Sequence, residues 1–121
     1  MDKQTSIIID NIKLINCTPH IIRFSDGIIL CPHYDYAEML RRVWSVDKIV
    51  MEIGDIVFVE PKFVADNKKA LNKICQKEKE GGVTRVFLIG SVISAQAYGY
   101  PVIALVSNTH TQKGKPEDKV C

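Results

Sequence analysis

VFLIGSVISAQAYGYPVIALV, residues 86–106, is the stretch that decides the class of fold. It begins with a run of four apolar residues and ends with a run of five, and neither run alternates with polar side chains. Such runs are typical of strands that are buried on both faces. A short helix, 92–98, is expected between them, directly after Gly90-Ser91. Two buried strands joined through a helix predict a small mixed α/β (α+β) domain.

Upstream segments predict further strands. Residues 12–24 contain two short β-type runs, which the turn-prone Asn-Cys-Thr-Pro at 16–19 separates. Proline lacks an N–H group and biases the preceding residue toward extended geometry, so a bend between two strands is expected there. The Ser-Asp-Gly at 25–27 predicts a hairpin whose returning strand is 28–31.

For the middle of the chain, the sequence allows two predictions of secondary structure. Residues 36–46 have the spacing of an amphipathic helix with Asp35 as its N-cap, although the β-branched residues and tryptophan of 42–46 also suit a strand. Three further features complete this region: a short strand at 47–51, a turn at 54–55, and a strand at 56–59 that ends at Glu60-Pro61.

The clearest helix is 66–80. Asp66 or Asn67 caps its start, a narrow apolar stripe and several lysines share its surface, and a glycine pair ends it. The chain therefore predicts a mixed β-sheet of about five to six strands with two to three helices, in a single domain at 1–108. The polar residues 109–121 are expected to form a flexible tail.

The composition is that of a small globular protein. A chain of 121 residues suits one domain, and an apolar fraction of 46% is enough for a core. The net charge of +2 is too small to predict binding to duplex nucleic acid. No apolar run is long enough to span a membrane, and the N-terminus lacks the features of a signal peptide. We expect a cytoplasmic protein with no membrane partner.

The chain has four cysteines: Cys17, Cys31, Cys75 and Cys121. They are widely separated and form no CxxC pair, so free thiols in a reducing compartment are the expectation. The alternative is a metal site built from Cys17, His20, Cys31 and His33, because their two segments could pair as a hairpin. We expect no metal and no cofactor.

The first candidate site is the junction after the strand at 86–89. A helix that begins directly after a buried strand directs free N–H groups, and the positive end of its dipole, at whatever lies beyond the strand. Ser91 adds a hydroxyl, Gly90 leaves room for a ligand near the backbone, and Gln96 adds a polar group. The alternative is that Ser91 only caps its own helix.

The second candidate site is the bend at 16–20. Asn16, Thr18 and His20 bring hydrogen-bond donors and acceptors together there, and His20 could titrate near neutral pH. The alternative is that Asn16 and Thr18 satisfy the backbone of their own turn.

A third candidate is Arg41, because a guanidinium binds phosphate oxygens through two parallel hydrogen bonds. Its neighbour is also an arginine, and a solvated face is the more common reason for such a pair. No catalytic residue is assigned, since the chain lacks a GxSxG nucleophile elbow, a P-loop and a dinucleotide-binding fingerprint. Cys17 and His20 could form a thiol and a base only if the bend brought them to one face.

Ile15-Asn16-Cys17-Thr18-Pro19-His20 resembles the Asn-Leu-Thr-Pro-His signature that opens a family of small bacterial and bacteriophage proteins, with Cys17 in place of the leucine. Residues 86–97 resemble the family's apolar strand and the Ser-Ala-Leu-Val-Ala-Gln-Ala-like helix start that follows it. The charged Arg-Asp-Asp step and Pro-Asp ending of many members are absent. The family is largely uncharacterised, so the resemblance implies a compact domain with a shared polar site, in a bacterial host cell, and no particular reaction.

The function expected from these features is binding of a small, anionic, nucleotide-like ligand. The predicted ligand-binding residues are Asn16, Thr18, His20, Arg41, Gly90, Ser91 and Gln96. In a bacteriophage setting, small homo-oligomeric domains of this size sequester cyclic nucleotide immune signals, so we expect a homo-oligomeric sponge. One alternative is a nucleotide-processing enzyme with His20 as acid or base. Another is a protein–protein inhibitor, which predicts a large apolar surface patch and no deep pocket.

Overall fold

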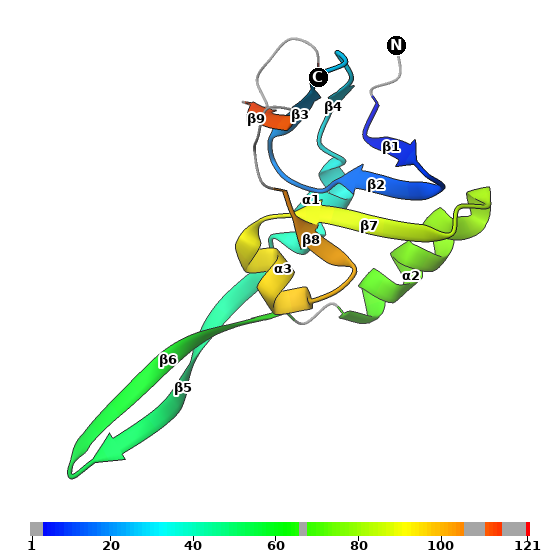
Figure 1. The fold of residues 1–121 in the computed structure, drawn as a ribbon. Coiled ribbons are helices and arrows are strands. Elements are labelled where there is room, and N and C mark those ends of the chain that lie inside the picture. Colours follow the sequence, from blue (N-terminus) through cyan, green and yellow to red (C-terminus); the bar gives the residue numbers. More distant parts are fainter. Residues whose placement is uncertain (1–3, 66–67, 106–110, 115–120) are drawn as a thin grey trace.

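The computed structural model describes residues 4–65, 68–105, 111–114 and 121, and its centre is a four-stranded sheet (Figure 1). The strand order is β1-β2-β7-β8, with β1 (Ser6–Ile9) antiparallel to β2 (Ile12–Asn16). The next two strands, β7 (Arg85–Gly90) and β8 (Val102–Ala104), run parallel to β2. Helix α3 (Val92–Tyr98) connects β7 to β8, as the apolar runs predicted.

One face of this sheet is covered by helices. These are α1 (Tyr34–Leu40), α2 (Lys68–Glu78), which continues into the 3-10 turn η1 (Lys79–Gly81), and α3. Leu40, Leu71 and Tyr98, one from each helix, belong to the same buried cluster as Ile15 and Leu88 of the sheet. This cluster is the larger part of the core.

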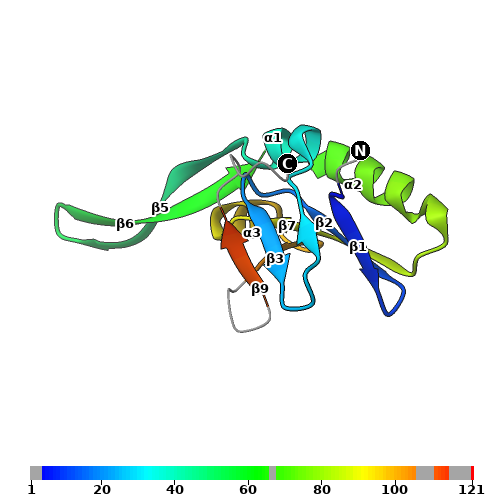
Figure 2. The ribbon, with the colours of Figure 1, turned by 90° about the horizontal axis from the view of Figure 1, so that it is seen from above.

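The other face of the sheet is covered by a second, three-stranded sheet. It has the order β4-β3-β9, formed by β3 (Ile21–Phe24), β4 (Ile29–Leu30) and β9 (Thr111–Gly114), and Figure 2 shows it on the opposite side from α1 and α2. Ile22 and Leu30 pack there against Ile89. Because side chains alternate along a strand, Leu88 and Ile89 of β7 supply the two different cores. A strand buried on both faces needs no polar positions, which explains its unbroken apolar run.

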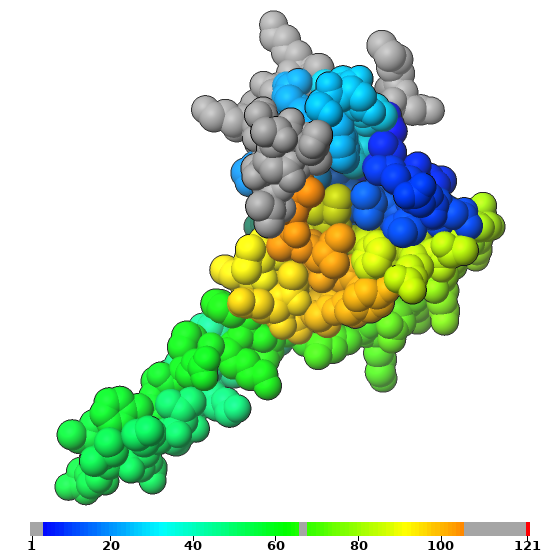
Figure 3. Space-filling model, viewed as in Figure 1, coloured from blue at the N-terminus to red at the C-terminus, as the bar shows by residue number. Residues whose placement is uncertain are grey.

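A long hairpin leaves this body. It consists of β5 (Val43–Ile53), the turn Gly54-Asp55 and β6 (Ile56–Ala65), and we call these residues the arm. Figures 1 and 3 show the arm projecting from the rest of the molecule, with α3 beside its root. From Trp44 to Lys62 every residue of the arm is exposed.

The α+β class is confirmed, and the first differences from expectation concern the ends of elements. The helix expected at 36–46 ends at Leu40, so the alternative of a strand beginning near residue 42 is correct. The N-cap of α1 is His33 and not Asp35, because the His33 side chain accepts the Tyr36 N–H bond. The expected caps Asp66 and Asn67 lie outside the described residues.

One strand of the central sheet was not predicted. It is β1, which forms a hairpin with β2 in which Asp10 and Asn11 both have positive φ angles, of 52° and 63°. Asp and Asn tolerate this conformation better than most residues, so the pair marks a tight turn. Strand β6 was predicted but is longer than expected, because it continues past Glu60-Pro61 to Ala65. A two-stranded ribbon has a free edge on each strand, where proline's missing N–H group costs little.

The expected flexible tail at 109–121 contributes structure to the domain. Its residues 111–114 form β9, which pairs antiparallel with β3, and its Cys121 forms a disulfide with Cys31. The expectation of four free thiols is therefore wrong for these two cysteines, and only Cys17 and Cys75 are free. Sequence spacing gave no signal for this pair, because the two cysteines are separated by 90 residues.

Across the described ranges, no helix is long and apolar enough to cross a membrane.

Candidate functional site

The bend at 16–20 and the segment 86–97 meet at one edge of the central sheet. Strand β2 pairs parallel with β7, and Asn16 lies opposite Ile89. The backbone N–H of Cys17 donates to the carbonyl oxygen of Ile89 at 2.9 Å. Since the carboxyl ends of neighbouring parallel strands lie at the same edge of a sheet, the bend at 16–20 comes to lie beside the start of α3.

Asn16 and Thr18 hold the bend together internally. Both residues are buried, with exposed fractions of 0% and 2%. The Asn16 Nδ2 atom donates to the carbonyl oxygens of His20 at 2.7 Å and Leu30 at 3.0 Å. Its Oδ1 atom accepts from the Thr18 N–H and hydroxyl groups, and the hydroxyl also contacts the His20 backbone. These bonds use the polar atoms of both side chains, as the alternative of a self-satisfied turn predicted.

The same bend also positions α1. The carbonyl oxygen of Asn16 accepts a hydrogen bond from the His33 N–H group at 2.8 Å. The His33 ring caps the helix and stacks on Tyr36, with ring centroids 3.8 Å apart. The bend at 16–20 therefore positions the start of α1 relative to the sheet. Arg41, at the end of the same helix, is positioned with it.

Ser91 is the N-cap of α3. Its hydroxyl accepts from the Ser94 N–H group at 3.0 Å and donates to the Ser94 hydroxyl, which in turn donates to the carbonyl oxygen of Leu40 at 2.8 Å. The alternative reading of Ser91 as a cap is thus correct, although Ser91 itself stays exposed. Helix α3 has only seven residues, so its dipole is a weak source of anion binding.

A cavity of about 450 Å³ lies between the bend, α1 and the start of α3. It is lined by Cys17, Pro19, Pro32, Tyr34, Ala37, Glu38, Arg41, Ser91 and Ser94. The wall is mostly apolar, and Arg41 and Glu38 are its charged residues. The Arg41 guanidinium lies 3.4 Å from the Glu38 carboxylate, and both side chains are more than half exposed, so this ion pair is weak.

Of the seven predicted ligand-binding residues, the structure brings two, Arg41 and Ser91, to this cavity. Gln96 lies instead beside a groove between α3 and the root of the arm, with Lys48 and Lys62. His20 is exposed, and its described hydrogen bonds are made by its backbone.

Gly90 is buried against other parts of the protein and not against open space. A Cβ atom there would lie 3.1 Å from Val102 Cγ1 and 3.3 Å from Ser94 Cβ. The expectation that this glycine leaves room for a ligand is therefore wrong, since the space belongs to β8 and α3.

Cys17 lines the cavity, but its thiol is a poor nucleophile. Burial, and to a smaller extent the negative charge of Glu78, raises the pKa of the Cys17 thiol far above its ordinary value of 9.0. The protonated thiol is the stable form near neutral pH. A catalytic thiol paired with His20 has no support from this arrangement.

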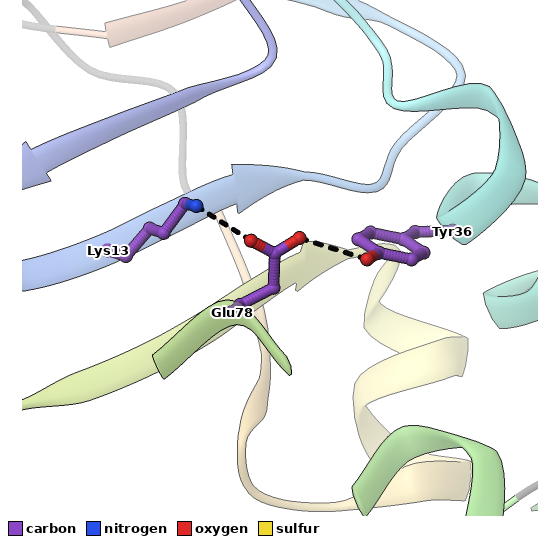
Figure 4. A network of polar contacts seen from close by, with 3 residues as sticks. All are labelled: Lys13, Tyr36 and Glu78. Atoms are coloured by element: carbon purple, nitrogen blue, oxygen red, sulfur yellow. Dashed lines mark hydrogen bonds and ion pairs between the residues drawn. The ribbon is translucent and has the colours of Figure 1, made fainter. Parts of the chain in front are cut away.

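A polar network lies on the helical side of the sheet (Figure 4). Lys13 Nζ donates to Glu78 Oε2 at 2.7 Å, and the Tyr36 hydroxyl donates to Glu78 Oε1 at 2.9 Å. Partial burial raises the pKa of Glu78, but the hydrogen bonds from Lys13 and Tyr36 and the Lys13 charge outweigh it, so the net pKa is below the ordinary 4.5. Burial, followed by the bond to Glu78, raises the pKa of Tyr36 to about 12. The network joins β2, α1 and α2.

The metal alternative is not supported. Within the described part of the chain, no group of three or more His, Cys, Asp or Glu residues is placed to hold a metal ion. Cys31 is bonded to Cys121, so it is not available as a ligand.

Some cavity residues were not expected from the sequence. Pro32, Ala37 and Glu38 line the cavity only because the chain turns from β4 into α1 beside the bend. The one local signal was the Cys-Pro-His at 31–33, which ends a strand and begins a helix.

Comparison with protein-family models, with curated protein sequences and with solved structures finds no match for this chain.

Proposed function

We propose that the protein binds a small anionic ligand, nucleotide-like in size and chemistry, in the cavity between the bend, α1 and α3. The observation that supports this proposal is the cavity itself, because both family-like segments contribute to it and Arg41 stands at its wall. A cavity of about 450 Å³ falls in the range of pockets for small molecules.

Arg41 is the group that favours an anion. Its guanidinium has five donors, and the contact at 3.4 Å to Glu38 is too exposed to hold it firmly. An incoming phosphate or carboxylate would compete with Glu38 for the same donors. The exposed ring of Tyr34, with Pro19 and Pro32, offers an apolar surface on which a base or other flat ring could stack.

The finer proposal rests on the resemblance of residues 15–20 and 86–97 to the bacterial and bacteriophage family. On that ground we propose a homo-oligomeric sponge for a cyclic nucleotide immune signal, acting in the cytoplasm of a bacterial host. A disulfide such as the one between Cys31 and Cys121 is uncommon in a reducing compartment. Whether these two cysteines are bonded inside cells therefore tests the proposed cytoplasmic location separately from ligand binding.

Two alternatives remain to be weighed. An enzyme with His20 as acid or base is less favoured, because His20 does not line the cavity. A protein–protein inhibitor predicts an apolar surface patch and no deep pocket. This chain has exposed apolar side chains along the arm and also a cavity, so the exposed side chains alone do not favour an inhibitor.

Native mass spectrometry tests the proposal. The purified protein is incubated with a panel of nucleotides and cyclic nucleotides, then measured under gentle and under denaturing conditions. A bound mass that is released unchanged supports a binding protein. A released mass that has been cleaved supports the enzyme, and no bound mass across the panel contradicts the nucleotide proposal.

A further inference from the structure

The outer half of the arm, Ile49–Val59, is apolar on both of its faces, and we call it the tip. Cross-strand partners share a face of a ribbon. Met51 pairs with Phe58 and Ile53 pairs with Ile56 on one face. The other face carries the pairs Ile49–Val59 and Glu52–Val57, with Glu52 as the charged member. The apolar side chains of these pairs are 45–60% exposed. A surface strand normally alternates between apolar and polar faces, so a ribbon that is apolar on both sides calls for a partner on both sides.

The exposed area is large enough for a stable interface. The chain has an accessible surface of 8227 Å², whereas a compact monomer of 13.6 kDa is expected to expose roughly 6,600 Å². The excess, about 1,600 Å² for one chain, is about twice the roughly 800 Å² that each partner buries in a standard protein–protein interface. The arm contributes to this excess, because every residue from Trp44 to Lys62 is exposed.

The charges of the arm point to a second copy of the same chain. The tip carries two exposed carboxylates, Glu52 and Asp55, and no cation. The inner half of the arm, which we call the root, exposes Lys48 and Lys62 beside Asp47 and Glu60. Arg42, directly before the arm, is also exposed and makes the net charge at the root positive. When two arms lie side by side in opposite directions, each acidic tip meets the other arm's basic root. The root also exposes Trp44 and Val46, which an apolar tip can cover.

A groove at the root gives the tip of the second arm a place to lie. It has a volume of about 550 Å³ and runs between β6 and α3, lined by Lys48, Glu60, Pro61, Lys62, Phe63 and Gln96. A lipid bilayer fits less well, because Glu52 and Asp55 stand at the end that would enter first and burying carboxylates there is costly.

We propose that the arm joins two copies of this chain in an antiparallel, two-fold symmetric exchange, with each tip in the root groove of the other copy. This inference does not depend on ligand binding, because the arm does not line the proposed ligand cavity.

Charge reversal provides the sharpest test. We expect Glu52→Lys/Asp55→Lys to weaken the dimer at least tenfold in sedimentation equilibrium, since a basic tip would face a basic root. Arg42→Glu/Lys62→Glu should weaken it as much, by placing acid against acid. An equimolar mixture of the two variants should regain the dimer, because both tip–root contacts are then complementary.

An uncharged variant controls for the apolar contacts. Ile53→Gln should weaken the dimer, and Ile8→Gln should not, although both isoleucines are 57% exposed. Near-UV circular dichroism confirms that each variant keeps its fold. A wild-type protein that stays monomeric into the high micromolar range overturns the proposal, as does a mixture that fails to regain the dimer. Binding of the monomer to lipid vesicles, or of the tip to another protein without self-association, also overturns it.

Discussion

The Oδ1 atom of Asn16 accepts two hydrogen bonds from Thr18, one from its hydroxyl at 2.6 Å and one from its backbone N–H group at 3.1 Å. The Nδ2 atom of the same asparagine donates to two carbonyl oxygens, one across the bend and one on β4. A single buried amide thus connects β2, the bend and the second sheet.

Replacing this amide should cost much of the stability of the domain. In Asn16→Ala, two carbonyl oxygens and one N–H group lose their partner in a buried place, so we expect a loss of about 2–4 kcal/mol in the free energy of unfolding. Urea denaturation measures this loss. The control is Asn72→Ala on the exposed surface of α2, where a change within about 0.5 kcal/mol is expected. Equal losses of stability in the two variants would show that the hydrogen bonds of Asn16 do not stabilise the fold.

The contact of Lys13 with Glu78 should make stability depend on pH in the acid range. The folded-state pKa of Glu78 lies below the ordinary value of 4.5, so the unfolded chain takes up the proton first as the pH falls. The stabilising contribution is complete above about pH 4.5 and is lost as the pH falls through the folded pKa.

Urea denaturation between pH 6 and pH 3 tests this sign. The stability advantage of the wild type over Glu78→Gln should shrink as the solution becomes more acidic. The exposed Glu80 provides the matched variant, Glu80→Gln, which should follow the wild type. An advantage that is constant over the whole range would contradict the role given to the network.

Gly90→Ala should destabilise the protein by about 1–3 kcal/mol, because the new methyl group would meet Val102 at 3.1 Å and Ser94 at 3.3 Å. Thermal unfolding measures the effect. Gly81→Ala is the control, since nothing lies within 4 Å of a Cβ atom at that position. If Gly90→Ala left stability intact and removed ligand binding, the original expectation of a ligand beside this backbone would be restored.

Two thiols, and not four, should react when the protein is denatured without reduction. Cys31 and Cys121 are bonded, while Cys17 and Cys75 are free. In the native protein, the buried Cys17 should react more slowly than Cys75. Mass spectrometry after alkylation counts the modified thiols, and Cys121→Ser should raise the denatured count to three. Four reactive thiols in the unreduced wild type would contradict the cross-link.

The elements that the sequence predicted well are those whose local chemistry agrees with their tertiary surroundings. The unbroken apolar run at 86–89 identified a strand buried on both faces, and the glycine pair after α2 marked its end. The hairpin between β3 and β4 followed from the Ser-Asp-Gly turn. In each of these places a short stretch of residues contains the physical reason for its own conformation.

The arm could not be predicted in the same way. Its residues predicted two short strands, at 47–51 and 56–59, and only the tertiary structure shows that they form one exposed, projecting ribbon. Helical spacing at 36–46 likewise hid the start of β5 at Val43, since valine and tryptophan suit either state.

The candidate site was predicted only in part. The two segments meet because β2 and β7 are parallel neighbours, and of the seven predicted residues only Arg41 and Ser91 line the cavity beside them. Asn16 and Thr18 were correctly identified as special, but their polar atoms serve the bend. Which polar residues face a cavity depends on side-chain partners far along the chain, such as the carbonyl oxygen of Leu40 that receives the Ser94 hydroxyl.

The central claim is that the cavity beside Arg41 binds an anion, and isothermal titration calorimetry on three variants tests it most directly. The titrant is the nucleotide from the panel that binds the wild type most tightly. Arg41→Gln should weaken binding at least tenfold, because a hydrogen-bonded charge contributes about 1.5–3 kcal/mol. Glu38→Gln should strengthen it by removing a competing carboxylate, and Arg85→Gln, an exposed arginine at the opposite end of β7, should leave it unchanged. Equal affinities for the wild type, Arg41→Gln and Glu38→Gln, or no binding of any nucleotide, would contradict the claim.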